Sequence, residues 1–309
     1  QDVLAGRVPA VLYFPGCGGA LFYRRIALAS LALLLHAGMA VVIPGQHLCC
    51  GYPLLAAGDA AHYESNLQHN RQAVAAALHA AGEAGFDVGM LVTACGSCRE
   101  SLVRHGLTGL DGQVLEHNDI VQFLVGRLPH EQSLSEERII FHASCHPAWS
   151  GVKATKDGGK AARALERLTG SSILINTGCC GESGAGAYTC PKIYNVLRER
   201  KRERLQAALA GYAQDAPILV GCPSCKIGIA RTLMTMAANH PARGRGHKGE
   251  GGEGQPVIDT HRPVLHSAEW LALTLLGRDW LAGFKGRMEK PEGAAGVRVV
   301  REGGDARQD

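Results

Sequence analysis

The chain has 309 residues, of which 46% are hydrophobic, so it can bury the core of one large domain or two ordinary ones. Its net charge is only +4, and basic and acidic residues alternate, as in residues 198–204. This pattern indicates a solvated helix face and not a nucleic-acid surface, so no nucleic-acid partner is expected. Apolar runs stay shorter than the about 18–20 residues of a membrane span, and no signal peptide is visible.

Short apolar segments alternate with helical patterns along the chain. In the first half, strands are predicted at 11–14, 40–43, 88–92 and 113–115, and helices at 21–36, 60–81 and 98–105, with a last one ending at 126–127. In the second half, strands are predicted at 138–141, 173–175, 218–220 and 264–266, and helices at 159–168, 191–210 and 225–238, with a last one ending at 276–278. Such alternation predicts an α/β fold with parallel sheets.

The same order of elements in both halves predicts two pseudo-repeated domains. We place the first at 1–130 and the second at 131–284. Residues 239–262 are rich in Gly, His and charge and are interpreted as a flexible insertion within the second domain. A disordered tail is expected over 285–309.

Ten of the eleven cysteines form two sets of five with matching order. The first set is Cys17, Cys49, Cys50, Cys95 and Cys98, and the second is Cys145, Cys179, Cys180, Cys222 and Cys225. Equivalent members are separated by nearly constant distances along the chain: 128 positions from Cys17 to Cys145, 130 from Cys49 to Cys179 and 127 from Cys95 to Cys222. An internal duplication explains this spacing, with the thiols serving the same purpose in both halves.

Each cysteine cluster lies where a predicted strand ends and a helix begins. In parallel sheets these loops form the binding crevice, so five sulfurs of each half are expected at one sheet edge. Helix N-termini at that edge offer N–H donors and positive dipole ends, which favour thiolates. The long chain and the odd cysteine count favour a reducing cytoplasm and metal-bound thiols over disulfides.

Five sulfurs exceed the four ligands of a structural zinc, and cysteine thiolates are the usual ligands of iron–sulfur clusters. The residue count therefore favours an iron–sulfur centre, with zinc plus a spare thiol and thiol redox chemistry left as alternatives. Gly51 and Gly181 are expected to let the backbone approach the sulfurs. His146 follows a candidate ligand and is a candidate donor to the centre, although local backbone capping explains it equally well, as it does His142. Cys190 has no counterpart in the first half and is interpreted as a buried apolar residue.

The doubled pattern resembles the CCG cysteine-rich domain, which occurs in heterodisulfide reductase and in the iron–sulfur subunits of glycolate oxidase. The motifs that carry the resemblance are Cys49-Cys50-Gly51, Phe141-His142-x-x-Cys145-His146, Cys179-Cys180-Gly181-Glu182-Ser183-Gly184 and Val220-Gly221-Cys222-Pro223-Ser224-Cys225. The later motifs are most similar to the carboxyl-terminal region of large flavin-linked D-lactate or glycolate dehydrogenases. The resemblance spans about residues 11–282 and implies two non-cubane [4Fe–4S] clusters, each held by the five cysteines of one repeat.

The resemblance also implies a function and partners. The expected function is electron transfer within a flavin-linked 2-hydroxy-acid dehydrogenase, as an oxidoreductase component. An FAD-containing domain or subunit, upstream or separate, would be the electron donor, and a quinone or another carrier would be the acceptor. We expect a cytoplasmic location, with peripheral contact at the inner face of the membrane as one form of it. The alternatives are cleavage of a disulfide substrate at the clusters and a structural zinc module.

Overall fold

Two four-stranded sheets in which every strand pairing is parallel form the framework of the protein. The computed structural model describes residues 6–128, 138–145, 154–182, 190–210, 216–238 and 262–288. The sheets have the orders β2-β1-β3-β4 and β6-β5-β7-β8. Their strands are β1 (Val8–Phe14), β2 (Ala40–Val42), β3 (Phe86–Thr93), β4 (Glu116–Asp119), β5 (Arg138–His142), β6 (Ser172–Asn176), β7 (Ile218–Val220) and β8 (Val264–His266). The predicted α/β fold and its duplication are confirmed.

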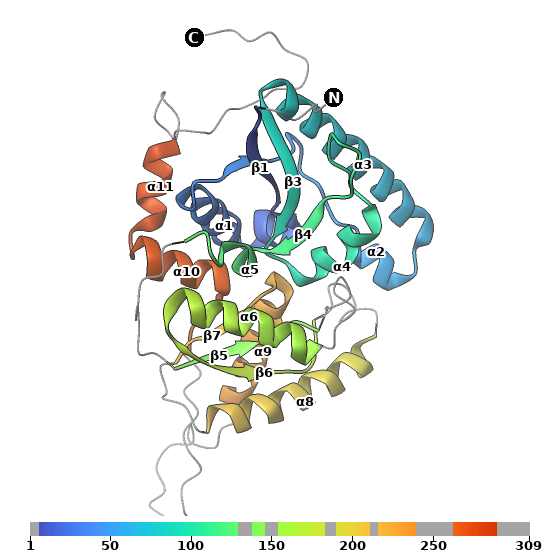
Figure 1. Ribbon diagram of the computed structural model, residues 1–309. Coiled ribbons are helices and arrows are strands. Elements are labelled where there is room, and N and C mark those ends of the chain that lie inside the picture. The colour runs from blue at the N-terminus through green and yellow to red at the C-terminus, as the bar shows by residue number, and fades with distance from the viewer. Residues whose placement is uncertain are drawn as a thin grey trace, which may run out of the picture.

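Helices cover both sheets, as expected for parallel strands whose two faces are buried (Figure 1). In the first repeat they are a short π-helix η1 (Gly18–Phe22), α1 (Arg24–His36), α2 (Tyr52–Ala57), α3 (Ala60–Glu83), α4 (Gly96–His105) and α5 (Ile120–Leu124). In the second repeat they are α6 (Ala154–Thr169), α8 (Pro191–Leu209), α9 (Pro223–Ala238), α10 (Ser267–Leu276) and α11 (Trp280–Met288). The predicted helix at 21–36 is split, because η1 and α1 are separate.

The two repeats exchange their last helices. Helix α10 of the second repeat packs against α1 of the first, and α5 of the first repeat packs against α6 of the second. Figure 1 shows α10 and α11 beside α1, although they follow the second sheet in sequence. Buried side chains from all four helices, such as Leu33, Phe123, Leu165 and Leu271, join one apolar cluster. The repeats therefore share a core.

This shared core makes a prediction about stability. Leu271 on α10 is fully buried in the cluster, so replacing it with alanine removes apolar contacts and leaves a cavity. We expect Leu271→Ala to lower the free energy of unfolding by about 2–5 kcal/mol. Because the core belongs to both repeats, urea unfolding should remain a single transition at a lower midpoint. Met234→Ala, at a side chain that is 70% exposed, should leave the midpoint almost unchanged.

Several boundaries differ from the expectations. The predicted tail begins too early, because Lys285 to Met288 continue helix α11, whose Trp280 and Phe284 are buried in the shared core. The remainder of that tail, from 289, and residues 239–261 of the predicted insertion at 239–262 lie outside the described residues. Arg262, its last residue, is buried and donates to the carbonyl oxygen of Ala216, so the predicted insertion extends one residue too far. The charge run at 198–204 is not wholly a solvated face, because Lys201 is only 1% exposed.

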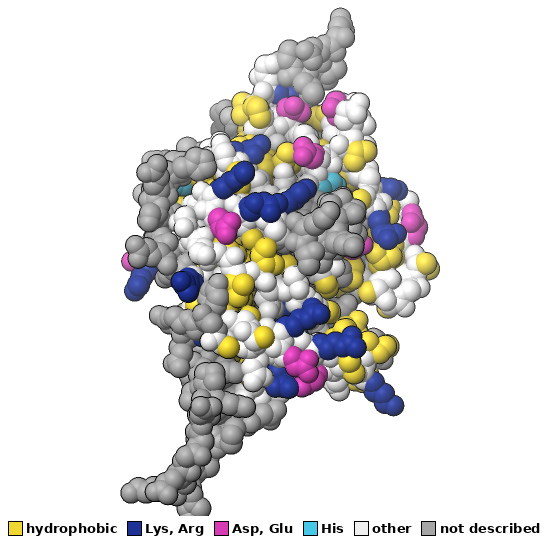
Figure 2. Space-filling model, turned by 60° about the horizontal axis from the view of Figure 1, so that its bottom comes forward, with side chains coloured by type: hydrophobic (Ala, Val, Ile, Leu, Met, Phe, Trp, Pro, Cys, Tyr) yellow, Lys and Arg dark blue, Asp and Glu magenta, His cyan; other side chains and the backbone are white. Residues whose placement is uncertain are grey.

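Charged and hydrophobic side chains are intermixed on the molecular surface. Figure 2 shows Lys and Arg side chains interspersed with Asp and Glu and separated by hydrophobic side chains over this face. Among the described residues, no helix is both long and apolar enough to cross a membrane.

Candidate metal centres

The five cysteines of the first set come from three neighbouring strand ends. Cys17 follows β1 and precedes η1, and Cys49 and Cys50 lie between β2 and α2. Cys95 follows β3 as the N-cap of α4, and Cys98 lies in the first turn of that helix. Parallel strands end at the same edge of a sheet, so the three loops meet there.

The sulfurs of the first set touch one another in an unbroken series. Side-chain hydrogen bonds join Cys17 to Cys49, Cys49 to Cys50, Cys50 to Cys98, and Cys98 to Cys95. The thiols of Cys17 and Cys50 donate to Cys49, and these bonds, in that order, lower the pKa of Cys49. Hydrogen bonding and burial raise the pKa of the Cys98 thiol. Cys49 is therefore the member of this set that most readily becomes a thiolate.

The second set repeats this arrangement at the edge of the second sheet. Cys145 follows β5, Cys179 and Cys180 follow β6, Cys222 follows β7, and Cys225 lies in the first turn of α9. Hydrogen bonds run from Cys145 to Cys179, then to Cys180, Cys225 and Cys222. All eleven cysteines are free thiols, so the structure brings each set together without a disulfide.

The two sets also meet each other. The Sγ atoms of Cys95 and Cys222 are 3.7 Å apart, and the hydroxyl of Ser97 lies 3.9 Å from the sulfur of Cys222. A Cβ atom on Gly96 would collide with the hydroxyl of Ser144 in the other repeat. Glycine is therefore required for this close approach. Ten sulfurs thus form one continuous series that crosses between the repeats.

The glycine after each Cys-Cys pair turns the backbone so that its amide faces a sulfur. Gly51 has φ +74° and Gly181 has φ +79°, a region that favours glycine. The amide of Gly51 donates to Cys49 Sγ at 3.5 Å, and that of Gly181 donates to Cys179 Sγ at 3.3 Å. N–H donors of this kind stabilise negative charge on sulfur.

Two alanine substitutions can distinguish the effect of the positive φ at Gly51 from the effect of its lack of space for a Cβ atom. Both Gly51 and Gly58 have positive φ, but a Cβ on Gly51 would lie 2.7 Å from Asn66 Nδ2, whereas a Cβ on Gly58 would meet nothing within 4 Å. We expect Gly58→Ala to cost about 1 kcal/mol of stability through backbone strain. Gly51→Ala should cost more in urea denaturation and should also weaken metal retention. Equal effects of the two variants would contradict a special role for Gly51.

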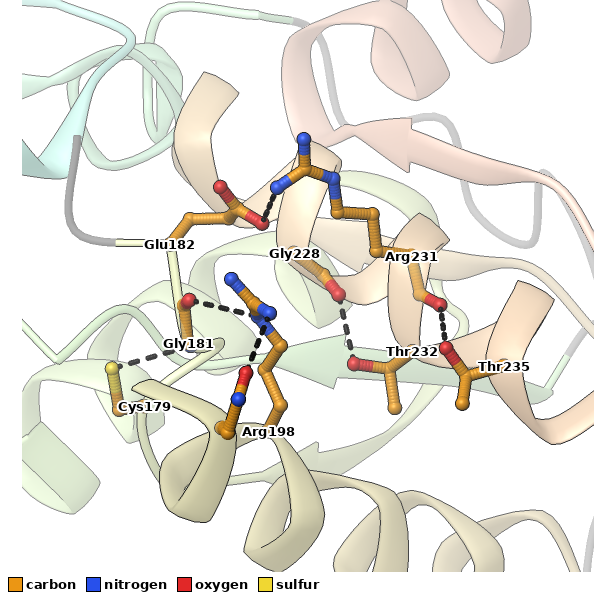
Figure 3. Close-up of polar contacts among 9 residues, drawn as sticks. Cys179, Gly181, Glu182, Arg198, Gly228, Arg231, Thr232 and Thr235 are labelled. Atoms are coloured by element: carbon orange, nitrogen blue, oxygen red, sulfur yellow. Dashed lines mark hydrogen bonds and ion pairs between the residues drawn. The ribbon is translucent and has the colours of Figure 1, made fainter. Parts of the chain in front are cut away.

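A different helix contacts each cysteine set: α3 contacts the first set and α8 contacts the second. Helix α3 presents amides, because Asn66 and Asn70 donate to the carbonyl oxygen of Cys49 at 2.9 and 2.7 Å. Helix α8 presents cations, because Arg198 Nε donates to the carbonyl oxygen of Gly181 at 3.3 Å, and Lys201 is buried. Figure 3 shows Arg198 reaching the turn that Cys179 and Gly181 form. The sequence analysis did not predict that amides contact the first set and cations the second.

The residue after each Cys-x-x-Cys motif forms an ion pair with an acidic residue at the start of the helix that follows the next strand. Arg99 lies 3.3 Å from Asp119, the N-cap of α5, and both side chains are buried. Lys226 lies 2.5 Å from Glu269 in the first turn of α10. These pairs anchor the cysteine-bearing helices α4 and α9 to the exchanged helices.

A cavity of about 400 Å³ opens beside the first set. Its lining is mainly apolar and aromatic, and includes Phe22, Tyr23 and Tyr52. The second repeat contributes Glu182 and Arg231, which form an ion pair at 2.8 Å (Figure 3). Among the described residues, the cysteines that line the cavity are Cys17, Cys50, Cys95 and Cys98, all of the first set. A molecule in this cavity would therefore be next to the first set.

The expectations for His146 and Cys190 have different outcomes. His146 lies outside the described residues, so its candidate role stays a prediction. Cys190 was expected to be buried but is exposed, because it is the N-cap residue of α8, ahead of the helix face that packs inward. It lies outside the series of contacting sulfurs.

The fold and site together define a class: duplicated α/β proteins in which three strand ends of each repeat bring five cysteines together. A family model described as CCG, cysteine-rich domain, matches residues 11–102 and 139–230. The chain belongs to this family, in two copies.

The chain is similar to several proteins whose names indicate redox chemistry. The chain is 26% identical over 226 residues to a component of the fumarate reductase (CoM/CoB) of Methanothermobacter marburgensis, covering 72% of this chain and 42% of that protein. It is 26% identical over 216 residues to lactate utilization protein A of Geobacillus kaustophilus, covering 65% of this chain and 84% of that protein. An uncharacterized iron-sulfur protein of Methanococcus maripaludis is 23% identical, with 43% of it covered. The chain thus spans less than half the length of the first and third of these relatives.

Proposed function

We propose that this chain is the iron–sulfur electron-transfer portion of a flavin-linked 2-hydroxy-acid dehydrogenase, with D-lactate or glycolate as substrate class. The contact between Cys95 and Cys222 is the observation that carries the proposal, because it joins two five-thiol sites into one path. The relative named lactate utilization protein A, most of which the chain covers, supports the substrate class.

The donor set fits two iron–sulfur clusters of four irons each. Each set offers five thiols joined in a series of contacts, one more than zinc takes, and N–H donors from Gly51 and Gly181 face the sulfurs. The two sets of five cysteines would hold the clusters, which when bound accept and release single electrons. The non-cubane type stays a prediction from the family resemblance.

Zinc is the second candidate, and one feature of the second set bears on it. His142, Cys180 and Cys225 place nitrogen and sulfur donors within 4.8 Å of one another, which suits zinc. However, Nδ1 of His142 is 2.8 Å from the Lys201 ammonium. The Nδ1 lone pair is taken by this hydrogen bond, and the proton of the neutral ring is then on Nε2, so neither nitrogen has a lone pair left for Zn²⁺. The arrangement therefore favours a centre held by cysteine sulfurs alone, as in iron–sulfur proteins.

This chain's own residues perform three tasks in the proposed function. The cysteines hold the centres, the buried apolar surroundings of Cys50, Cys98, Cys180 and Cys225 exclude water, and the cavity beside the first set admits a small redox partner. Its aromatic lining suits a planar ring such as a quinone. An FAD-containing domain or subunit would supply the electrons. The cytoplasm, with contact at the inner membrane face, is the proposed location.

Electron flow through the anaerobic, iron-loaded protein tests this function. Photoreduced FMN is added as donor, and a water-soluble short-chain quinone as acceptor, while EPR follows the centres. We expect both centres to be reduced and then reoxidised by the quinone. Reoxidation by an organic disulfide, with release of its thiols, would support the disulfide-reductase alternative instead. Centres that neither donor nor acceptor affects would contradict electron transfer.

A further inference from the structure

The second set has a buried cation where the first has an amide. When the repeats are aligned at a shift of 131 positions, Lys201 corresponds to Asn70, and the buried leucines Leu205 and Leu209 correspond to Val74 and Leu78. Asn70 is fully buried and donates to the carbonyl of Cys49. Lys201 holds the equivalent place beside the second set, where its charge interacts with Cys225, Cys180 and Cys179.

Three acceptors surround the Lys201 ammonium. They are Oδ1 of Asn176 at 2.5 Å, Nδ1 of His142 at 2.8 Å and the carbonyl oxygen of Thr177 at 3.0 Å. An ammonium has three N–H donors, so each acceptor receives one. A neutral amine has only two N–H groups, so the three acceptors indicate the charged form of Lys201.

This network fixes the state of His142. Because Nδ1 accepts from Lys201, the proton of the neutral imidazole is on Nε2. The ring is neutral, because a second buried cation only 2.8 Å from the ammonium would be strongly repelled. The ring is fully buried, and Nε2 has no hydrogen-bond partner among the described residues. A ring nitrogen of His142 lies within 4.8 Å of the sulfurs of Cys180 and Cys225.

The first set lacks this donor. His142 is the last residue of β5, three positions before Cys145, and Phe14 is the last residue of β1, three positions before Cys17. Phe14 is likewise buried, but its ring has no N–H group. At two equivalent positions, therefore, the second repeat carries an N–H donor and a cation where the first carries a hydrocarbon ring and an amide.

We propose that His142 donates its Nε2–H to a sulfur of the second iron–sulfur centre, and that Lys201 positions this imidazole and adds positive charge, so that the second centre has the higher reduction potential. The inference rests on the proposed function. Donors and positive charge near a cluster stabilise its more negative, reduced form. An electron passing from the first centre to the second would oxidise the first by one unit and reduce the second by one unit. The cysteines beside the cavity would then hold the centre that exchanges electrons with a partner, and those beside His142 and Lys201 the centre that retains the electron.

EPR-monitored redox titration of the anaerobic, iron-loaded protein tests the proposal with Lys201→Asn and His142→Phe, which introduce the residues of the first repeat. The double variants Cys50→Ala/Cys98→Ala and Cys180→Ala/Cys225→Ala assign each signal to its centre. We expect each repeat-mimicking variant to shift the oxidised-to-reduced ratio of the second centre about tenfold, or about 59 mV to lower potential for one electron. The first centre should not move. His117→Phe, at a histidine of β4, is the control and should move neither potential.

A second measurement needs no substitution. In protein carrying ¹⁵N-labelled histidine, the reduced second centre should show a magnetic coupling to an imidazole nitrogen in pulsed EPR, and His142→Phe should remove it. Iron content reports separately on the proposed function. Full iron with no histidine coupling, or with potentials that Lys201→Asn and His142→Phe leave unchanged, would overturn this inference and leave the electron-transfer function standing. A protein without iron would remove both.

Discussion

Replacing Cys50 and Cys98 together with alanine is expected to halve the iron content of the protein, from about eight atoms per chain to about four. The two thiols are joined by a hydrogen bond in the middle of the first series of sulfurs, so the remaining three cannot enclose a cluster. The equivalent variant of the second set, Cys180→Ala/Cys225→Ala, should also lose about half of the iron, in this case from the second centre. Anaerobic iron and acid-labile sulfide analysis measures both.

The control for this pair is Cys190→Ala, because Cys190 is exposed and outside both series. It should keep all of the iron. Cys95 and Cys222 stay in place in these variants because their sulfurs touch across the repeats, and a change in either would disturb both sites. Loss of iron in the Cys190 variant, or full iron in both double variants, would contradict the assignment of the ten cysteines to two centres.

Asp119→Asn is expected to lower the free energy of unfolding by about 3 kcal/mol, a large share of the about 5–15 kcal/mol that stabilises a typical domain. Asp119 and Arg99 are each only 5% exposed. The asparagine keeps the N-cap acceptor for the amide of Val121 but removes the charge that opposes the buried guanidinium. Urea denaturation of the iron-loaded protein provides the measurement.

Asp59→Asn is a matched control, since Asp59 is also a helix N-cap and accepts from the amide of His62, yet its ion pair with His62 is at the surface. This variant should change the urea midpoint little. The double variant Arg99→Met/Asp119→Asn should recover part of the loss, because neither buried charge remains. If Asp119→Asn and Asp59→Asn have equal effects, the buried pair does not anchor α4 to α5.

The sequence predicted the fold because its signals are local. Strand ends coincide with the cysteine motifs, and parallel strands bring those ends to one edge whatever the other contacts are. The repeat spacing of Cys17, Cys49 and Cys95 with their partners likewise needs no knowledge of packing. The positive φ of Gly51 and Gly181 fits the turn that the Cys-Cys-Gly motif indicated.

The rest depends on tertiary contacts that no local pattern records. The interleaved charges around Lys201 are typical of a surface helix, and only the position of α8 against β6 and the cysteine loops makes one lysine buried. The contact between Cys95 and Cys222 and the cavity beside the first set both require the two repeats to meet. The exchange of α5 and α10 could not be inferred from element order, because each helix follows its own sheet in sequence but packs against the other repeat.

The most direct test of two thiolate-held iron–sulfur centres is the metal content of the unmodified protein, purified without oxygen. We expect about eight irons and a matching amount of acid-labile sulfide per chain, no stoichiometric zinc, and EPR signals from the centres. Two zinc ions per chain with no iron would contradict the central claim and would leave the ten cysteines with a structural role.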